Sequence, residues 1–252
     1  MTDIHPPATL SVLKIPLNCV ESPLFPSVIA SCSSVDELWL YLTTGETYLP
    51  AIDYLPPDIL PNLRSYHGPH TYSPWFTKHR PLESVDFVLS AQPTDLYTSI
   101  GILSDKIKSF SCRINSFDAR LIATIHTSFP SLEHLNISGT SVDIDGLFSA
   151  LSIAKSQKDL ASIEMAIETG SSRLTNNWAL TVANMFLSRL IRAYPFLKHA
   201  RLVCQPHTSV VWVCLKEKSR PTVTIDNLEL RIEKEESPYK TNAIWDSFRF
   251  RS

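Results

Sequence analysis

The chain has 252 residues and a mass of 28.3 kDa, with 44% hydrophobic residues, 19% charged residues and a formal net charge of −2. This composition excludes a disordered chain, and the near-neutral charge gives no electrostatic signature of nucleic-acid binding. Only six glycines are present, and the sequence contains no P-loop, no dinucleotide-binding fingerprint and no G-x-S-x-G nucleophile elbow.

A short apolar pattern of the form L-x-x-L-x-L recurs along the chain and predicts a strand at each occurrence. Clear copies begin at Leu10, Val35, Leu82, Ile107, Leu132 and Leu160, and weaker copies begin at Leu63 and Leu197. Successive copies start 25, 28, 19, 25, 25, 28 and 37 residues apart. Most of these distances fall in the window of about 20–29 residues that is typical of a leucine-rich repeat.

We therefore predict an α/β leucine-rich-repeat solenoid of about eight turns, with a parallel concave sheet and helices on the convex side. A second repeated position, which we call the second register, supports the repeat prediction. In such a repeat an asparagine follows the strand, and its side chain bonds backbone groups where the chain turns. Asn18 and Asn115 occupy that position, and Thr140 gives a weaker version. The alternative is another α/β fold whose strands merely recur at similar distances.

Between the strands, apolar residues at three- to four-residue spacing predict the helices. Thr94 is the expected N-cap of one helix and Asp118 of the next. Their apolar positions are Leu96, Ile100 and Leu103 in the first, and Leu121, Ile122, Ile125 and Phe129 in the second. Further helices are expected at residues 147–151 and 178–194.

We place the solenoid at residues 1–203, after which the chain changes character. Residues 210–215 and 222–232 are β-like runs around a polar turn, and they predict a hairpin within a C-terminal β cap at residues 204–232. Residues 233–252 are expected to form a polar tail. Three aromatic residues of this tail are expected to dock on the body, namely Trp245, Phe248 and Phe250.

Cysteine usage and the start of the chain indicate a compartment. The five cysteines are an odd number without C-x-x-C spacing, at positions Cys19, Cys32, Cys112, Cys204 and Cys214. This favours free thiols in a reducing environment. The first residues lack the basic and apolar regions of a signal peptide, and no apolar run is long enough to predict a membrane span. We expect a cytoplasmic or nuclear protein.

Three predicted strands are preceded by a P-x-L pattern, at residues 129–135, 60–66 and 194–197. These phrases resemble the repeats of fungal F-box-associated leucine-rich-repeat proteins, and the resemblance covers about residues 8–203. It implies the substrate-recognition part of a Skp–cullin–F-box ubiquitin ligase receptor. A Skp-type adaptor is then an implied partner if an F-box is supplied elsewhere.

The sequence departs from that family because no recognisable F-box precedes the first repeat. The string Leu55–Leu60 resembles the opening of an F-box. However, Pro61 and Pro69 are expected to break the helices that should follow it, and Leu63 and Leu82 occupy repeat positions. A linker is the simpler interpretation of this string.

Side chains that alternate with the buried strand positions are expected on the concave face of the sheet. Its central row should comprise Lys14, Trp39, His67, Asp86, Ser111, Asn136, Glu164 and Arg201, with neighbours Tyr41, Arg113, His134 and His199. Aromatic side chains among charged ones are typical of a protein-binding surface. We predict that the partner is bound by Trp39, Tyr41, His67, Asp86, Arg113, His134, Asn136, Glu164 and Arg201. The alternative is that Trp39 and Tyr41 only cover the end of the sheet.

Catalytic and metal-binding interpretations have weaker support. His67, His70 and His79 could supply three imidazoles to a zinc ion, but the prolines around them predict a loop of plain surface histidines. Asp143 and Asp145 resemble the start of a calcium loop that lacks its later glutamate.

No local signature selects a trio of residues for nucleophilic catalysis. We therefore expect a non-enzymatic protein-interaction module without a cofactor or metal, which binds neither nucleic acid nor membranes. The alternatives are a stand-alone repeat regulator or scaffold, and an enzyme whose site no short motif reveals.

Overall fold

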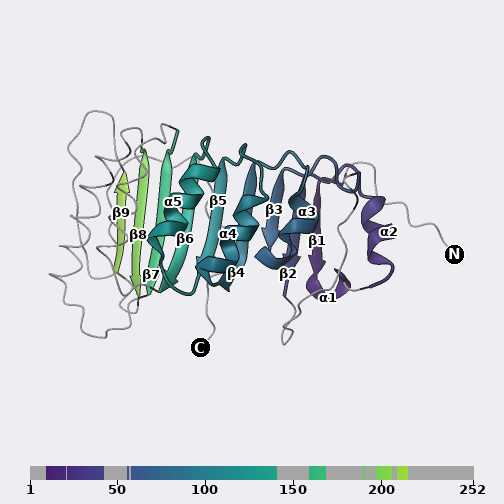
Figure 1. The fold of residues 1–252 in the computed structure, drawn as a ribbon, viewed down its shortest axis with the longest axis horizontal. Coiled ribbons are helices and arrows are strands. Elements are labelled where there is room, and N and C mark those ends of the chain that lie inside the picture. The colour runs from purple at the N-terminus through teal and green to yellow at the C-terminus, as the bar shows by residue number, and fades with distance from the viewer. Residues whose placement is uncertain are drawn as a thin grey trace.

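The computed structural model describes residues 10–20, 22–42, 56, 58–140, 159–168, 190, 194, 197–205 and 209–214. These residues form one sheet in which nine strands follow each other in chain order (Figure 1). The strands are β1 Val12–Pro16, β2 Glu37–Tyr41, β3 Ser65–Gly68, β4 Ser84–Ala91, β5 Ser109–Ile114, β6 His134–Thr140, β7 Ser162–Glu168, β8 His199–Gln205 and β9 Ser209–Cys214.

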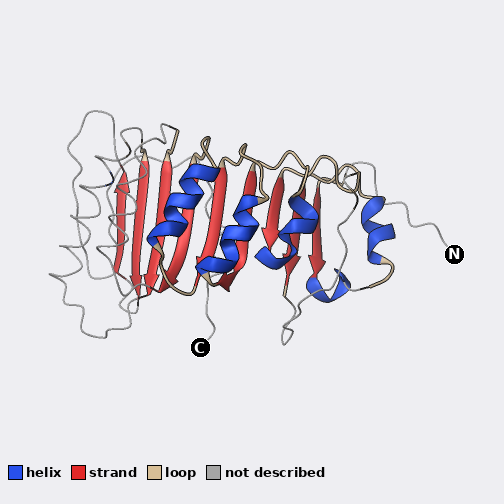
Figure 2. Cartoon of the chain, viewed as in Figure 1, coloured by secondary structure: helices blue, strands red, loops and turns tan. Residues whose placement is uncertain are grey.

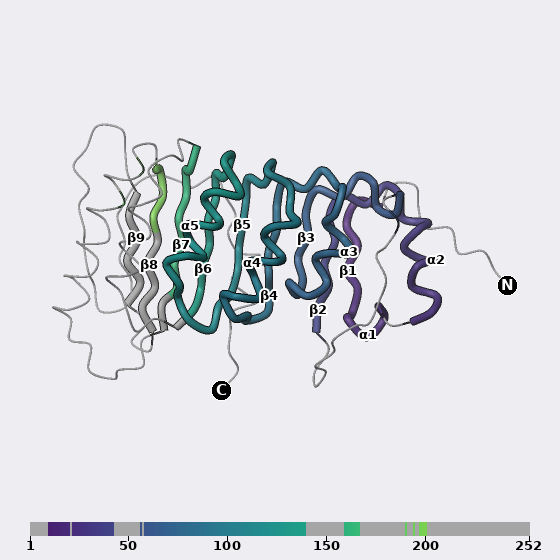
Figure 3. The backbone as a smooth tube through the Cα atoms, in the orientation of Figure 1, coloured from purple at the N-terminus to yellow at the C-terminus, as the bar shows by residue number. Residues whose placement is uncertain are grey.

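Strands β1 to β8 pair in parallel, so the chain crosses over between each strand and the next. Each of the eight predicted copies of the apolar pattern forms one of these strands. The α/β class and the open parallel sheet are thus confirmed, and the layout resembles a solenoid. The tube in Figure 3 follows the chain as it moves one strand along at each turn.

Short helices occupy the crossovers that the structure describes. They are α1 Leu17–Val20, α2 Phe25–Ala30, the 3₁₀ turn η1 His70–Tyr72, α3 Ser73–Thr77, α4 Pro93–Gly101 and α5 Ala119–Ser128. Helices α3, α4 and α5 lie on the same face of the sheet (Figure 2). The predicted helix at 147–151 lies outside the described residues. Of the one predicted at 178–194, only the buried Leu190 and Tyr194 are described.

The two capping predictions have different outcomes. Asp118 caps α5 as predicted, because its Oδ1 accepts a hydrogen bond of 2.8 Å from the amide of Arg120. Thr94 is not the cap of α4: the N-cap is Gln92, which makes no side-chain capping bond. Pro93 opens this helix instead, since its fixed φ suits the first helical position and its missing N–H costs nothing there.

The same pair of backbone hydrogen bonds marks the start of each parallel strand from β2 to β8. The carbonyl of Ser11 accepts bonds from the amides of Asp36 and Glu37, at 2.9 and 3.1 Å. The equivalent carbonyls on the following turns, each bonded to two successive amides, are those of Asp36, Arg64, Glu83, Lys108, Glu133 and Ala161. The pair persists across both the shortest and the longest spacing, so differences in length are absorbed elsewhere in each turn.

The P-x-L phrases form a tight turn just before the strand. The amide of Leu63 bonds the carbonyl of Leu60 at 3.2 Å, and the amide of Leu132 bonds that of Phe129 at 3.2 Å. Proline follows the first residue of both turns, which is the position where its fixed φ is favoured. The P-x-L pattern in the sequence therefore corresponds to a tight turn that recurs before the strands.

The core lies between the sheet and the helices. One row of buried side chains crosses it in register, at 0–3% exposure: Leu38, Tyr66, Val85, Phe110, Leu135, Ile163 and Ala200. The copy at β3 departs from the apolar pattern at Gly68, where the ring of Tyr66 fills the volume that a larger side chain would need. A Cβ on Gly68 would lie 2.7 Å from the Tyr66 hydroxyl, which donates to the carbonyl of Pro69 at 2.8 Å.

The segment after β3 corrects the prediction of a loop. Residues 70–77 are helical, with Pro69 as the N-cap of η1 and Pro74 in the first turn of α3, where proline is tolerated. Both Trp75 and Phe76 are buried under the sheet. The prolines start these short helices rather than break them.

A buried arginine closes this shortest turn. Arg80 is 4% exposed, and its guanidinium donates to the carbonyls of Ile59 at 2.7 and 3.0 Å, Trp75 at 3.0 Å, Lys78 at 3.1 Å and Pro56 at 3.2 Å. Burial lowers the pKa of this guanidinium from its ordinary value. Arg80 thereby ties part of the string that resembles an F-box opening to the turn before β4.

The C-terminal end of the sheet matches one part of the predicted cap. The run predicted at 210–215 is strand β9, which pairs antiparallel with β8. Its predicted partner at 222–232 lies outside the described residues, and so does the tail with Trp245, Phe248 and Phe250. β8 itself continues to Gln205, past the expected end of the solenoid at residue 203.

Candidate functional site

The side chains that alternate with the core rows form what we call the polar face. Its central row is Lys14, Trp39, His67, Asp86, Ser111, Asn136, Glu164 and Arg201, and strand pairing joins each of these residues to the next. The predicted central row is therefore confirmed as a structural row. Lys14 is exposed and the next six residues are half-buried; for Arg201 the structure describes only the backbone pairing.

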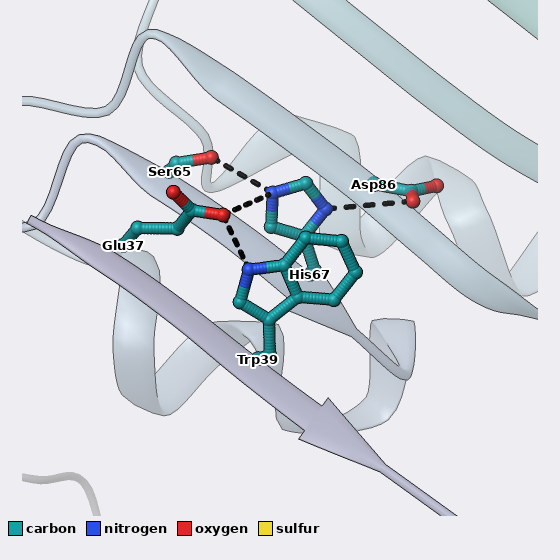
Figure 4. A network of polar contacts seen from close by, with 5 residues as sticks. All are labelled: Glu37, Trp39, Ser65, His67 and Asp86. Atoms are coloured by element: carbon teal, nitrogen blue, oxygen red, sulfur yellow. Dashed lines mark hydrogen bonds and ion pairs between the residues drawn. The ribbon is translucent and has the colours of Figure 1, made fainter. Parts of the chain in front are cut away.

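One part of the polar face is a network of polar contacts across β2, β3 and β4 (Figure 4). The His67 Nε2 atom lies 3.0 Å from the Ser65 hydroxyl and 3.7 Å from Glu37 Oε1. The other ring nitrogen, Nδ1, lies 3.5 Å from Asp86 Oδ2. The indole N–H of Trp39 donates to the same Glu37 oxygen. One imidazole thus joins carboxylates from two different strands.

Trp39 is held on both sides. Its ring stacks on His67 with a centroid distance of 3.8 Å and an interplanar angle of 5°. The Lys14 Nζ atom lies over the indole at 4.9 Å from the centroid, a distance at which a cation is attracted to an aromatic ring. Because β1 and β3 flank β2, Lys14 and His67 approach the indole from opposite sides. Trp39 is therefore an immobilised, half-buried aromatic group.

Tyr41 has a different environment. It lies at the end of β2 with 45% of its surface exposed, beside Leu42 at 44%. Tyr41 therefore presents an accessible aromatic surface, which the sequence predicted equally for Trp39.

Arg113 is half-buried on β5, where it pairs with Ser90 just after an irregularity in β4.

The remaining predicted residues lie on the C-terminal half of the polar face. His134 is exposed, whereas Asn136 and Glu164 are half-buried. His199 is exposed on β8, and its pKa is lowered by partial burial and by the nearby His134 and Lys198. The predicted binding residues therefore share one face, and the group around His67 is linked by the hydrogen bonds and ion pairs described above.

Small hydroxyl side chains also lie on the polar face, on strands β4 to β7. They are Ser84, Ser109, Ser111, Ser138 and Ser162, all half-buried. Sequence reasoning named only Ser111. The others could have been found from the alternation of the strands, because they occupy the same face as the central row.

A charged ridge runs beside the polar face at the strand starts. Glu83 accepts from Arg64 at 3.0 Å and from Lys108 at 3.0 Å, and the two cations lower the pKa of its carboxyl, Lys108 most strongly. Sequence reasoning missed this ridge. The signal is the residue after the first apolar position in five successive copies, which reads Asp36, Arg64, Glu83, Lys108 and Glu133 with alternating sign.

The three histidines of the hypothetical metal set are not brought together. His67 lies on the polar face, His70 is half-buried in η1, and His79 is exposed with a φ of 64°. Within the described ranges, no group of three or more histidine, cysteine, aspartate or glutamate residues is arranged to hold a metal. His70 is also not the surface residue expected, because its Nδ1 atom is buried; burial lowers its pKa. Asp143 and Asp145 lie outside the described residues.

The two asparagines of the second register lie at the surface, and for Asn115 the structure shows a contact between turns. Asn18 and Asn115 are both exposed. Asn115 accepts a hydrogen bond from the Ser90 hydroxyl of the preceding turn, and its backbone amide bonds the carbonyl of Ala91 at 2.9 Å. Asn115 therefore links adjacent turns, partly through a side-chain contact with Ser90 that the sequence pattern did not predict.

Cysteine chemistry adds little to the site. Cys19, Cys32 and Cys112 are free thiols. Cys112 is buried in the core, and burial raises its pKa well above the ordinary range of a thiol. A thiol in this state is a poor nucleophile.

Comparison with known proteins does not identify the chain. A scan against models of protein families gives no match, and a search of the curated proteins finds no match either. In the part of the chain that the structure describes, none of the helices has the length and apolar character that a membrane span requires. Function must therefore be inferred from the polar face itself.

Proposed function

We propose that this chain is a leucine-rich-repeat solenoid that binds a protein partner on its polar face. The observation that carries the proposal is the unbroken central row, in which eight parallel strands place aromatic, charged and polar residues in register. Such a row offers many contacts on a scaffold that does not need to rearrange. Preorganised surfaces of this kind lose little conformational entropy on binding.

The repeat assignment rests on two recurring features. The paired backbone bonds at the strand starts and the tight turns before them repeat from one crossover to the next. Solenoids are built from units of this kind, each of which contacts mainly its neighbours.

For the partner, the favoured hypothesis is a substrate of a Skp–cullin–F-box ubiquitin ligase, as the resemblance in repeat style implies. Purified Skp-type adaptor and cullin subunits are the direct probes. Both should co-purify with the full chain if it carries or recruits an F-box. If neither binds when the chain is well folded, the ligase hypothesis is wrong, and a stand-alone regulator or scaffold becomes the better interpretation.

Partner binding on the polar face has its own test. We would compare proteins captured by the wild type with those captured by Arg113→Ala and Tyr41→Ala. The matched control is Arg120→Ala on helix α5, whose side chain is 88% exposed. A set of proteins lost with both polar-face variants and retained by the control supports the proposal. Equal capture by all four chains would place the interface elsewhere.

An enzyme remains the alternative from a different class. It would need a reactive group on the polar face, where His67 with its two carboxylates is the strongest candidate. Loss of a measured turnover in His67→Gln, with protein capture unchanged, would favour the enzyme over the binding module.

A further inference from the structure

The ring of His67 has a carboxylate near each nitrogen. Nε2 faces Glu37 at 3.7 Å, and Nδ1 faces Asp86 at 3.5 Å. The side chains are 17% exposed for His67, 33% for Glu37 and 28% for Asp86. The network is therefore enclosed enough to hold its geometry and open enough to exchange protons with water.

A neutral imidazole can satisfy this geometry in one way. Its single N–H, placed on Nδ1, donates to Asp86, while Nε2 accepts from the Ser65 hydroxyl at 3.0 Å. Glu37 is then bonded by the Trp39 indole rather than by the histidine. In this state His67 connects β3 to β4 but makes no ion pair with β2.

A protonated imidazole carries an N–H on both nitrogens. Nε2 then becomes a donor toward Glu37 and Ser65, and Nδ1 keeps its bond to Asp86. The two ion pairs would join β2 to β4 through one ring. The charged groups around this ring are Glu37 on β2, Asp86 on β4 and, beyond the indole, Lys14 on β1. Their sum with His67 changes from −1 to zero when the proton binds.

We propose that His67 is a proton-sensitive connector of the polar face. Proton uptake ties β2 to β4 and removes the net negative charge from the N-terminal half of the face. Histidine is the side chain suited to this role because its charge ordinarily changes between about pH 5 and 8. The consequence for function rests on the proposed partner binding: capture should differ between the two ends of that range.

The stack on Trp39 supplies a direct readout that needs no partner. An imidazolium in contact with an indole quenches its fluorescence more strongly than a neutral imidazole does. The emission of the full chain would be followed from pH 8 to pH 5.5 for the wild type and for Trp39→Phe. The difference between the two titrations isolates the signal of Trp39 from that of the other four tryptophans.

We expect the Trp39 signal to fall on acidification in the wild type. Two variants should abolish this loss: His67→Gln keeps a polar side chain, and His67→Phe keeps the stacked ring, but neither can take up a proton. Far-UV circular dichroism verifies that each is folded. An unchanged acid titration of Trp39 emission in either folded variant would overturn the proposal. Because this assay needs no partner, its failure is distinguishable from failure of the capture experiment.

Discussion

The guanidinium of Arg80 should be worth several kilocalories per mole to the folded state. It is 4% exposed and donates five hydrogen bonds to backbone carbonyls. Arg80→Ala removes these donors and leaves the buried carbonyls of Ile59 and Trp75 without them. An unsatisfied buried acceptor costs about 1–3 kcal/mol. The loss is partly offset because the variant no longer buries a charge.

The expected net loss is about 2–4 kcal/mol, a large share of the roughly 5–15 kcal/mol that stabilises an ordinary domain. Urea unfolding followed by circular dichroism measures it, with a midpoint shift of roughly 1–2 M. Arg80→Lys should be intermediate, because one ammonium cannot reproduce the fork of the guanidinium. Arg64→Ala is the control, since this exposed ion pair with Glu83 should contribute under about 1 kcal/mol. If Arg80→Ala is as stable as that control, the carbonyls do not depend on Arg80.

Three further predictions concern packing, charge and pH. Gly139→Ala should destabilise the fold by about 1–3 kcal/mol, because the added Cβ would lie 2.6 Å from the Ile114 carbonyl oxygen. The control Gly101→Ala, whose Cβ would have nothing within 4 Å, should not be destabilised, and equal melting temperatures of the two variants would contradict this. Glu83→Gln should lower the melting temperature slightly at low salt and not at about 1 M salt, because exposed ion pairs are screened; a loss that persists at high salt would show a different cause. Burial lowers the pKa of His70 in the folded chain below its ordinary value of 6.5. The unfolded chain therefore takes up that proton first, and the free energy of unfolding decreases as the pH falls below 6.5. His70→Gln should therefore lose less stability than the wild type between pH 7.5 and 5.5 in urea titrations, and a parallel decline would refute this.

The regular parts of the fold could be predicted from the sequence because each strand repeats one burial pattern. Leu38, Phe110 and Leu135 occupy equivalent buried positions, and a two-residue alternation then fixes which side chains share the other face. For the same reason the central row could be predicted from the sequence alone.

Contacts between distant segments could not be predicted in this way. Arg80 reads as an ordinary charged residue before a proline, and nothing local reveals that the carbonyls of Ile59 and Trp75 surround it. His126 and Tyr194 are similar, since their 2.9 Å hydrogen bond joins residues 68 positions apart. The residues that hold Trp39 in place lie on three strands, so its immobilisation is a property of the register and not of its neighbours in sequence.

Strand pairing also gives the polar face a fixed scale. Neighbouring strands are about 4.8 Å apart, so the central row from Lys14 to Arg201 covers about 34 Å. An extended peptide of about ten residues has the same length. The backbone bonds at the strand starts keep neighbouring strands aligned whatever the length of the crossover. A protein partner of the proposed kind that binds in extended form would therefore meet side chains of this face at regular intervals of about 4.8 Å.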